Sequence, residues 1–175
     1  MVLFSAAFAV AWLPAMAGDL AEVQLLDSLD EPRRFCFDLV GYKSRARPER
    51  GLQAHTCYSY QGSVAVDQGF DRARALQGEF YLPHFDVCVT AASRQPDARL
   101  TLAVCNRAGE QKFTLHGSGE ITPAADRTLC VTAASGDSRE GGGGDPVHLI
   151  RALSLQPCAR SREPYQRWRL GPPGK

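Results

Sequence analysis

The chain has 175 residues, with 20 lysines and arginines against 19 aspartates and glutamates. This balance gives no electrostatic reason to expect nucleic acid or an anionic membrane surface as a partner. The length is sufficient for one domain with a hydrophobic core.

The first segment has the pattern of a secretory signal peptide. Residues 2–13 are apolar and uncharged, and Ala15-Met16-Ala17 provides the small residues that signal peptidase recognises. An apolar run of about a dozen residues is too short to cross a bilayer as a helix. We therefore expect cleavage after Ala17 and a mature protein that is secreted, extracellular or periplasmic, with no insertion in a membrane.

Six cysteines follow the signal segment and bound three similar units. The sequence at 88–93 is identical to that at 130–135, and 36–41 is a weaker copy. An even number of cysteines in an exported chain favours disulfides over a metal site. Because each unit contains one pair of cysteines, we predict three disulfides: Cys36–Cys57, Cys88–Cys105 and Cys130–Cys158.

The units have the local pattern of short β-strands. In the stretch 87–91 apolar residues alternate with Cys88 and Thr90, and 35–39 and 129–133 repeat the pattern. Period-two alternation between Gly, Pro and Asp breaks is typical of antiparallel strands. A single short helical turn is expected at 71–77. Three such units cannot bury their apolar faces alone, so we expect them to pack about a pseudo-threefold axis.

Each unit ends in Gln-x-aromatic, at Gln68 and Phe70, Gln111 and Phe113, and Gln166 and Trp168. Three cysteine-bounded units with this ending, each of roughly forty residues, resemble the ricin B-type (R-type) lectin family. The resemblance implies an all-β fold, the β-trefoil of three pseudo-repeats with one intra-repeat disulfide each. It also implies that the three aromatic residues pack in the core and that the three glutamines tie loops.

The resemblance divides the chain into four parts. We expect a signal peptide at 1–17, an N-terminal arm with the first strand at 18–33, the lectin domain at 34–170 and a C-terminal tail at 171–175.

The first unit carries the residue types with which this family binds sugar. The family's positions correspond here to Asp38, Gln53, His55 and Asp67, beside Gln68. A carboxylate accepts hydrogen bonds from vicinal hydroxyls, an amide donates and accepts, and a flat ring covers the apolar face of a pyranose. Alternation places Asp38 on the face opposite the apolar residues of its strand, so we expect an exposed acceptor.

Two positions depart from the family pattern. His55 stands where a Trp or Tyr is usual, so Tyr58 or Tyr60 is an alternative source of the stacking ring. Asp67 stands where Asn is usual. The second and third units carry Thr90 and Thr132 in place of the Asp, and we expect a single competent site.

These residues predict a carbohydrate-binding module for galactose-type or N-acetylgalactosamine-type glycans or glycoproteins. The alternative is a degenerate trefoil that binds a protein partner or serves as a structural subunit. The sequence lacks nucleophile, metal-ligand and phosphate-loop motifs, so we expect neither an enzyme nor a metal or other cofactor.

The third unit contains a ten-residue insertion at 136–145, GDSREGGGGD. Four consecutive glycines lose much backbone entropy on ordering, and the neighbouring side chains are polar. We therefore expect a mobile surface loop that has no part in the fold.

Overall fold

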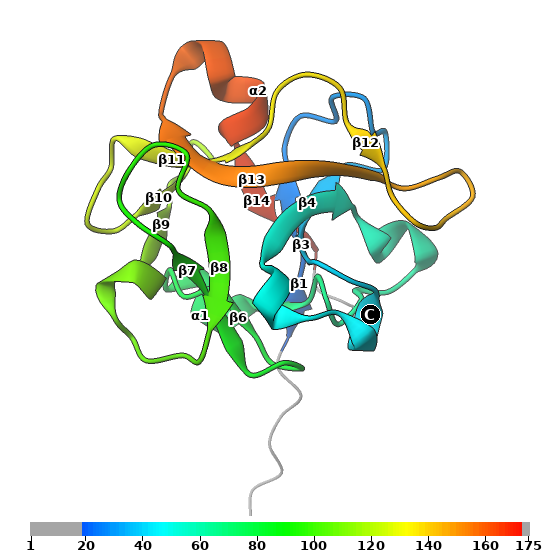
Figure 1. The fold of residues 1–175 in the computed structure, drawn as a ribbon, viewed down its shortest axis with the longest axis horizontal. Coiled ribbons are helices and arrows are strands. Elements are labelled where there is room, and N and C mark those ends of the chain that lie inside the picture. The colour runs from blue at the N-terminus through cyan, green and yellow to red at the C-terminus, as the bar shows by residue number, and fades with distance from the viewer. Residues whose placement is uncertain (1–18, 173–175) are drawn as a thin grey trace, which may run out of the picture.

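Three antiparallel hairpins, one from each cysteine-bounded unit, form the framework of the protein (Figure 1). The computed structural model describes residues 19–172, and the expected signal peptide and its cleavage site lie outside them. The strands are β1 (Leu20–Ala21), β2 (Val23–Leu25), β3 (Phe35–Leu39), β4 (Leu52–Thr56), β5 (Phe70–Asp71), β6 (Tyr81–Leu82), β7 (Val87–Ala91), β8 (Leu100–Ala103), β9 (Phe113–Leu115), β10 (Ile121–Pro123), β11 (Leu129–Ala133), β12 (Arg139–Glu140), β13 (Leu149–Pro157) and β14 (Trp168–Leu170).

Helices are short in this fold. They are α1 (Arg72–Leu76), α2 (Glu163–Gln166) and 3-10 turns at Lys43–Arg45, Pro48–Arg50, Tyr58–Gln61, Gly109–Gln111 and Arg160–Arg162. The helical turn predicted at 71–77 is confirmed as α1, which begins where the Asp71 side chain accepts a hydrogen bond from the backbone N–H of Arg74, at 2.9 Å. No helix within residues 19–172 is long and apolar enough to cross a membrane. The predicted all-β class is confirmed.

The three hairpins β3–β4, β7–β8 and β11–β13 share one register. In each, the first cysteine lies opposite the residue two positions before the second cysteine, which gives the pairs Cys36 with His55, Cys88 with Ala103 and Cys130 with Gln156. This register brings the two cysteines of a unit together at the end of its hairpin. The three predicted disulfides are present: Cys36–Cys57, Cys88–Cys105 and Cys130–Cys158.

One glutamine closes each unit with the same set of hydrogen bonds. The Oε1 atoms of Gln68, Gln111 and Gln166 accept from the backbone N–H that follows the second cysteine, at 2.9, 2.8 and 3.0 Å. Their Nε2 atoms donate to the carbonyl that precedes this cysteine, at 3.0, 3.0 and 3.1 Å. Each Nε2 also donates to the side chain two positions after the first cysteine, namely Asp38, Thr90 or Thr132. The glutamine therefore joins both strands of its hairpin to the following loop.

Aromatic side chains from different units meet in the core. Phe70, Phe113 and Trp168, the aromatic residues of the three Gln-x-aromatic endings, are all buried. The ring of Phe37 lies 4.7 Å from that of Trp168 and 6.1 Å from that of Phe70, in edge-to-face arrangements that aromatic pairs favour. Trp168 satisfies its indole N–H by donating to the Val131 carbonyl at 2.9 Å.

Strand β13 connects the third unit to the first. It is nine residues long, crosses the molecule in Figure 1, and pairs with β11 at one end and with β4 further along. Ile150 lies opposite His55, and Ala152 lies opposite Gln53. The same sheet continues through β3 and β2 to β14, so the last strand of the chain closes against one of the first.

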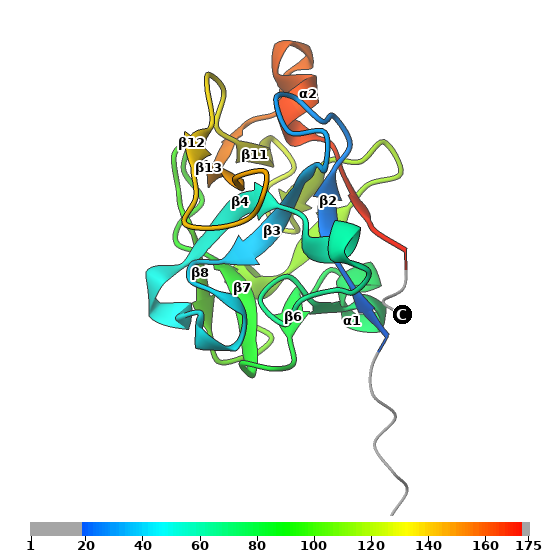
Figure 2. The ribbon, with the colours of Figure 1, turned by 90° about the vertical axis from the view of Figure 1, so that its right-hand side faces the viewer.

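The expectation that 136–145 is a loop with no part in the fold is wrong. Arg139 and Glu140 form β12, which pairs with Ile150 and Leu149 of β13. Figure 2 shows this hairpin above β4. The Gly141 N–H donates to the His148 carbonyl at 2.6 Å, and the His148 N–H donates to the Gly143 carbonyl at 2.8 Å. The free edge that β13 offers provides pairing partners that the glycine-rich composition does not reveal.

Candidate binding site

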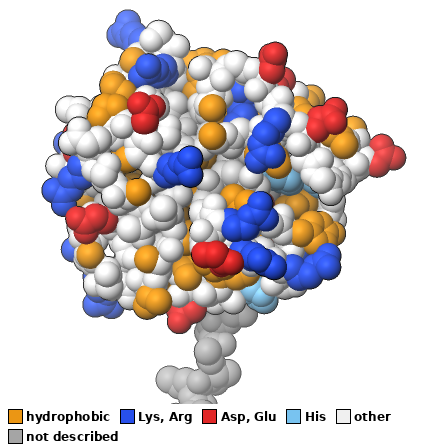
Figure 3. Space-filling view, in the orientation of Figure 1, with side chains coloured by type: hydrophobic (Ala, Val, Ile, Leu, Met, Phe, Trp, Pro, Cys, Tyr) orange, Lys and Arg blue, Asp and Glu red, His pale blue; other side chains and the backbone are white. Residues whose placement is uncertain are grey.

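A pocket of about 540 Å³ lies where the first unit meets the hairpin of the third. This volume is within the range of about 300–1,000 Å³ that is common for small-molecule sites. Figure 3 shows blue lysine and arginine side chains close together on the right-hand half of the face, around orange and pale blue side chains. The lining side chains come from the segment after β3, from β4, from the turn after Cys57 and from the hairpin: Tyr42, Lys43, Arg45, Gln53, His55, Tyr58, Gln61, His148 and Ile150, with Gly41 and Gly142–Gly144.

Asp38 does not line the pocket. Its side chain is buried at 1% exposure, and the expectation of an exposed acceptor is wrong. Its Oδ1 accepts a hydrogen bond from Gln53 Nε2 at 2.8 Å, and its Oδ2 accepts one from Gln68 Nε2 at 2.9 Å. Strand β3 lies inside the sheet and the Asp67–Gln68 segment packs over it, with the Leu39 N–H donating to the Asp67 carbonyl at 2.9 Å. Both faces of β3 are therefore covered.

Asp67 is a second buried carboxylate behind the pocket wall. Its Oδ2 accepts a hydrogen bond from the backbone N–H of Lys43, whereas Oδ1 has no partner among residues 19–172. Burial raises the pKa of the Asp67 carboxyl. Burial and the negative charge of Asp67 together raise the pKa of Asp38 well above its ordinary value. Two carboxyl groups in this environment favour the neutral form of Asp38.

Gln53 and His55 reach the pocket from β4. Gln53 Nε2 is committed to Asp38, so its Oε1 faces the other way, where Arg139 Nη2 donates to it at 3.4 Å. Nδ1 of His55 lies 2.9 Å from the Thr56 carbonyl. Because a carbonyl only accepts, we assign the hydrogen to Nδ1, which leaves Nε2 as an acceptor. Burial lowers the pKa of His55 to about 4, so the ring is neutral at pH 7.

The pocket has an aromatic wall. The ring of Tyr58 lies 5.3 Å from that of His55 and 5.3 Å from that of His148. Of the two tyrosines expected as alternative stacking rings, Tyr58 lines the pocket, while Tyr60 lies outside the lining and its hydroxyl is 2.8 Å from His148 Nε2. The hydroxyl of Tyr58 has no hydrogen-bond partner within the described part of the chain. Tyr58 borders the pocket, although only 3% of the residue is exposed.

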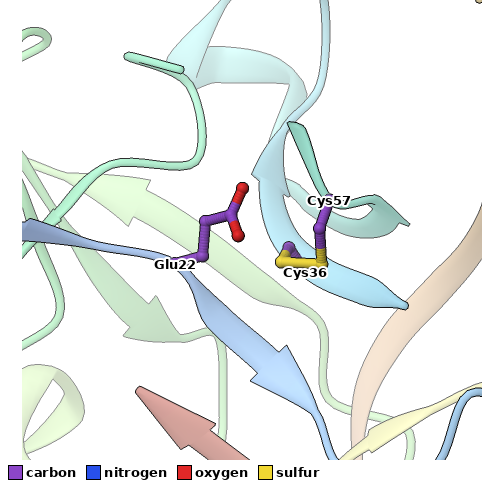
Figure 4. Close-up of side chains that lie close together, drawn as sticks. All are labelled: Glu22, Cys36 and Cys57. Carbon is purple, nitrogen blue, oxygen red and sulfur yellow. A yellow bond between two sulfur atoms is a disulfide. The ribbon is translucent and has the colours of Figure 1, made fainter. Parts of the chain in front are cut away.

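A buried glutamate holds the turn that carries Tyr58. The Glu22 carboxylate lies beside the Cys36–Cys57 disulfide (Figure 4), within 4.8 Å of both sulfur atoms. It accepts hydrogen bonds from the Ser59 N–H at 2.8 Å and from Gln24 Nε2 at 2.9 Å. Both sulfurs are bonded to each other, so this group offers no thiolate to a metal ion. Its geometry fits a positioning role for the Tyr58–Gln61 turn.

Of the five predicted site residues, the structure brings Gln53 and His55 into the pocket and places Asp38, Asp67 and Gln68 behind its wall. Sequence reasoning missed the contribution of the third unit, above all His148. The available signal was the insertion itself, because an elongated loop is often where a fold carries its function.

No protein-family model and no curated protein matches the chain. Among solved structures, the fold is similar to a mutant C-terminal domain of an earthworm lectin in complex with 6'-sialyllactose. The TM-score is 0.55 at 14% identity, over 90% of this chain and 99% of that one. It is also similar to the Haemophilus ducreyi cytolethal distending toxin, with a TM-score of 0.55 at 18% identity, over 94% of this chain and 90% of that one. These likenesses show a shared fold.

Proposed function

We propose that this chain is an exported carbohydrate-binding module of the β-trefoil type whose single competent site is the pocket of the first unit. Its ligands are galactose-type or N-acetylgalactosamine-type glycans, free or on glycoproteins. The observation that carries the proposal is the pocket itself. It combines an aromatic wall with polar groups that have spare hydrogen-bonding capacity, namely Gln53 Oε1, His55 Nε2 and the Tyr58 hydroxyl.

These groups match the chemistry of a sugar. A pyranose has one face of C–H groups that packs on aromatic rings, and a rim of hydroxyls that donate and accept. Tyr58 and His55 supply the rings that border the pocket, with 3% and 6% of the two residues exposed. Gln53 Oε1 and His55 Nε2 accept from hydroxyls, and the Tyr58 hydroxyl can donate to one. The fold shared with the earthworm lectin domain, which was crystallised with 6'-sialyllactose, supports the same function.

Asp38, Asp67 and Gln68 serve this site indirectly. Asp38 holds the Gln53 amide in one orientation, with Gln53 Nε2 at 2.8 Å from Oδ1. Gln68 holds Asp38 and also binds the backbone N–H of Tyr58 at 2.9 Å, so it fixes the turn that presents the Tyr58 ring. Asp67 binds the Lys43 backbone and anchors the segment after β3. A preorganised site of this kind loses little entropy when it binds.

The export part of the proposal rests on the signal pattern and on the three disulfides, which are suited to an oxidising compartment. N-terminal sequencing of the exported protein should give Gly18 as the first residue. An unprocessed N-terminus would contradict the proposed cleavage after Ala17.

The burial of Asp38 favours the second candidate function, a trefoil that binds a protein or serves as a structural subunit. Both oxygens of Asp38 already have protein partners, so the carboxylate offers nothing to a sugar without rearrangement. The two functions differ in a simple measurement. A sugar-binding module is retained on a column of immobilised galactose or N-acetylgalactosamine, whereas a module with a decayed site is not.

The decisive variant is Tyr58→Phe. It removes only a hydroxyl that has no partner within residues 19–172, so the melting temperature should be unchanged. Glycan affinity measured by calorimetry should fall by roughly fivefold to tenfold, the cost of one lost hydrogen bond. Tyr165→Phe, at a half-exposed tyrosine of the third unit, is the matched control and should bind like the parent. Equal binding by the two variants would show that the sugar makes no hydrogen bond to the Tyr58 hydroxyl, and binding by neither parent nor variants would leave the protein-binding function.

A further inference from the structure

The pocket has charged lining residues of one sign only. Among the lining residues, Lys43 and Arg45 carry charge, and no aspartate or glutamate is present. Both cations come from one 3-10 turn, Lys43–Arg45, which follows β3. The turn is held by backbone bonds from the Arg45 N–H to the Tyr42 carbonyl at 2.9 Å and from the Ala46 N–H to the Lys43 carbonyl at 3.0 Å. These bonds fix the backbone from which both side chains extend at the rim.

Neither cation is neutralised by a partner. Within residues 19–172, the side chains of Lys43 and Arg45 make no ion pair and no hydrogen bond to the protein. They lie on aromatic faces instead: Lys43 Nζ is 5.7 Å from the centre of the Tyr58 ring, and the Arg45 guanidinium is 5.5 Å from that of Tyr42. A ring face positions a cation without using up its N–H donors. Both heads remain able to bind an anion.

The neighbouring titratable groups oppose this charge at one point, where the buried Asp67 carboxyl attracts Lys43 from behind the pocket wall. His55 and His148 line the wall, and burial lowers the pKa of both, so they are neutral at pH 7. The carboxyl groups of Asp38 and Asp67 lie behind the wall. On the hairpin, Glu140 and Asp145 are exposed and outside the lining, and Arg139 adds a further positive charge beside Gln53.

We propose that the sugar site of the first unit selects anionic glycans, with Lys43 and Arg45 binding a carboxylate or sulfate carried by the sugar. The inference rests on the proposed function, because the same pocket must hold the sugar ring. The guanidinium of Arg45 presents paired N–H donors that match the two oxygens of a carboxylate or sulfate, and the Lys43 ammonium adds a point charge. Tyr58 and His55 then bind the neutral part of the same ligand.

The test compares four soluble probes on the full-length exported protein: lactose, a neutral fucosylated lactose trisaccharide, 6'-sialyllactose and 6'-sulfated lactose. The neutral trisaccharide controls for size, and the last two separate a carboxylate from a sulfate. We expect at least one anionic probe to bind roughly fivefold to tenfold more tightly than both neutral probes in about 0.1 M salt. The preference should shrink in about 1 M salt, where the Debye length falls from about 10 Å to about 3 Å.

The variants assign the preference to its residues. Lys43→Gln combined with Arg45→Gln should remove the preference, so that the anionic probes bind no more tightly than the neutral trisaccharide. Arg47→Gln is the matched control, since Arg47 is an exposed arginine of the same segment outside the lining. It should keep the full preference.

Each outcome decides one of the two proposals. Lactose binding without any preference for the charged probes, or a preference that survives the double variant, overturns the anionic-glycan inference and leaves sugar binding in place. If none of the four probes binds at millimolar concentration, the proposed function is wrong and the inference falls with it.

Discussion

The surroundings of Asp38 give it a role that its position in the sequence does not indicate. Its position two residues after Cys36 matches a ligand-contacting position of the ricin B-type pattern, yet its two oxygens accept from Gln53 and Gln68 inside the protein. The second and third units place Thr90 and Thr132 at the same point, each bonded to the glutamine of its own unit. The three residues therefore share a structural task, and in the first unit that task is performed by a carboxyl group.

Asp38→Ala should destabilise the fold. The substitution leaves the amide donors of two buried side chains, Gln53 and Gln68, without their acceptor, and each unsatisfied buried group costs about 1–3 kcal/mol. Urea unfolding should show a loss of about 2–4 kcal/mol, together with weaker glycan binding because Gln53 is no longer oriented. Thr90→Ala removes two weaker contacts, in which the hydroxyl accepts from Gln111 Nε2 and donates to the Cys88 carbonyl, both at 3.2 Å, and should cost less. Equal stability of the parent and the Asp38→Ala variant would contradict this role.

The neutral state of His55 makes stability depend on pH. Burial lowers its pKa from 6.5 to about 4, with a smaller contribution from His148, against the opposing hydrogen bond to the Thr56 carbonyl. Below pH 6.5 the unfolded chain binds a proton that the folded protein does not bind until about pH 4. Stability should therefore fall between these values, by roughly 3 kcal/mol in total.

His55→Gln should remove that part of the pH dependence, whereas His84→Gln, at an exposed histidine, should retain it. The raised pKa of Asp38 acts in the opposite sense, because it favours a protonated folded state and reduces stability as pH rises. The informative quantity is therefore the difference between the urea-unfolding curves of parent and variant at each pH. If the free energies of unfolding of the parent and of His55→Gln changed in parallel from pH 7 to pH 4, this would rule out a neutral buried His55.

At the scale of elements, the hairpin between β12 and β13 forms one wall of the pocket. It is tied to the remainder of the molecule through Arg151, whose guanidinium donates to Asp30 at 2.6 Å and to the Ala134 carbonyl at 2.8 Å. Asp30 in turn accepts from the Ser138 hydroxyl at 2.8 Å. Although burial opposes it, hydrogen bonds from Arg151 and Ser138 lower the pKa of Asp30 to about 2. The base of the insertion is thus held by charge and hydrogen bonds in place of apolar packing.

Gly144→Ala should damage the pocket with little effect on the core. Gly144 has φ of +88°, and a Cβ atom there would lie 2.4 Å from the Cδ2 atom of the His148 ring. His148 must move, and the aromatic wall moves with it, so glycan affinity should fall by about tenfold or more, while the melting temperature falls by a few degrees at most. Gly142→Ala has open space around its Cβ and is the matched control. Equal glycan affinity of the two variants would show that the hairpin does not form the binding wall.

At the scale of the molecule, the three units share a hairpin with one disulfide, but only the first and third line the pocket. The disulfides close segments separated by 21, 17 and 28 residues. The chain-entropy model gives each a stabilisation of about 3 kcal/mol, with differences of only about 0.4 kcal/mol between the shortest and the longest. Replacing both cysteines of one unit by serine should therefore lower the free energy of unfolding by similar amounts in all three cases.

Guanidinium unfolding of the three double-serine variants checks this equivalence. A loss in the first unit that is much larger than in the other two would show that its disulfide also supports the pocket through Glu22 and the Tyr58 turn. Glycan affinity of the Cys88 and Cys105 double variant should stay close to that of the parent, since the second unit does not line the pocket.

The sequence alone determined the features that depend on neighbours along the chain. The identical stretches at 88–93 and 130–135, with their weaker copy at 36–41, were enough to predict three units and the pairing of all six cysteines. Period-two alternation predicted the first strand of each hairpin, and the stretch 71–77 was expected to form the short helical turn that is α1. These properties follow from local backbone geometry and from chain connectivity, which a sequence displays directly.

Tertiary structure alone decided which faces are covered and which distant segments meet. Alternation places Asp38 opposite the apolar residues of β3, but only the packing of the Asp67–Gln68 segment shows that this second face is also buried. The pocket depends on the pairing of Ile150 with His55, residues of different units nearly a hundred positions apart. The free edge of β13 orders a glycine-rich insertion that would be mobile by itself. Burial and pairing across units are properties of the assembled sheet, so no pattern within a single unit records them.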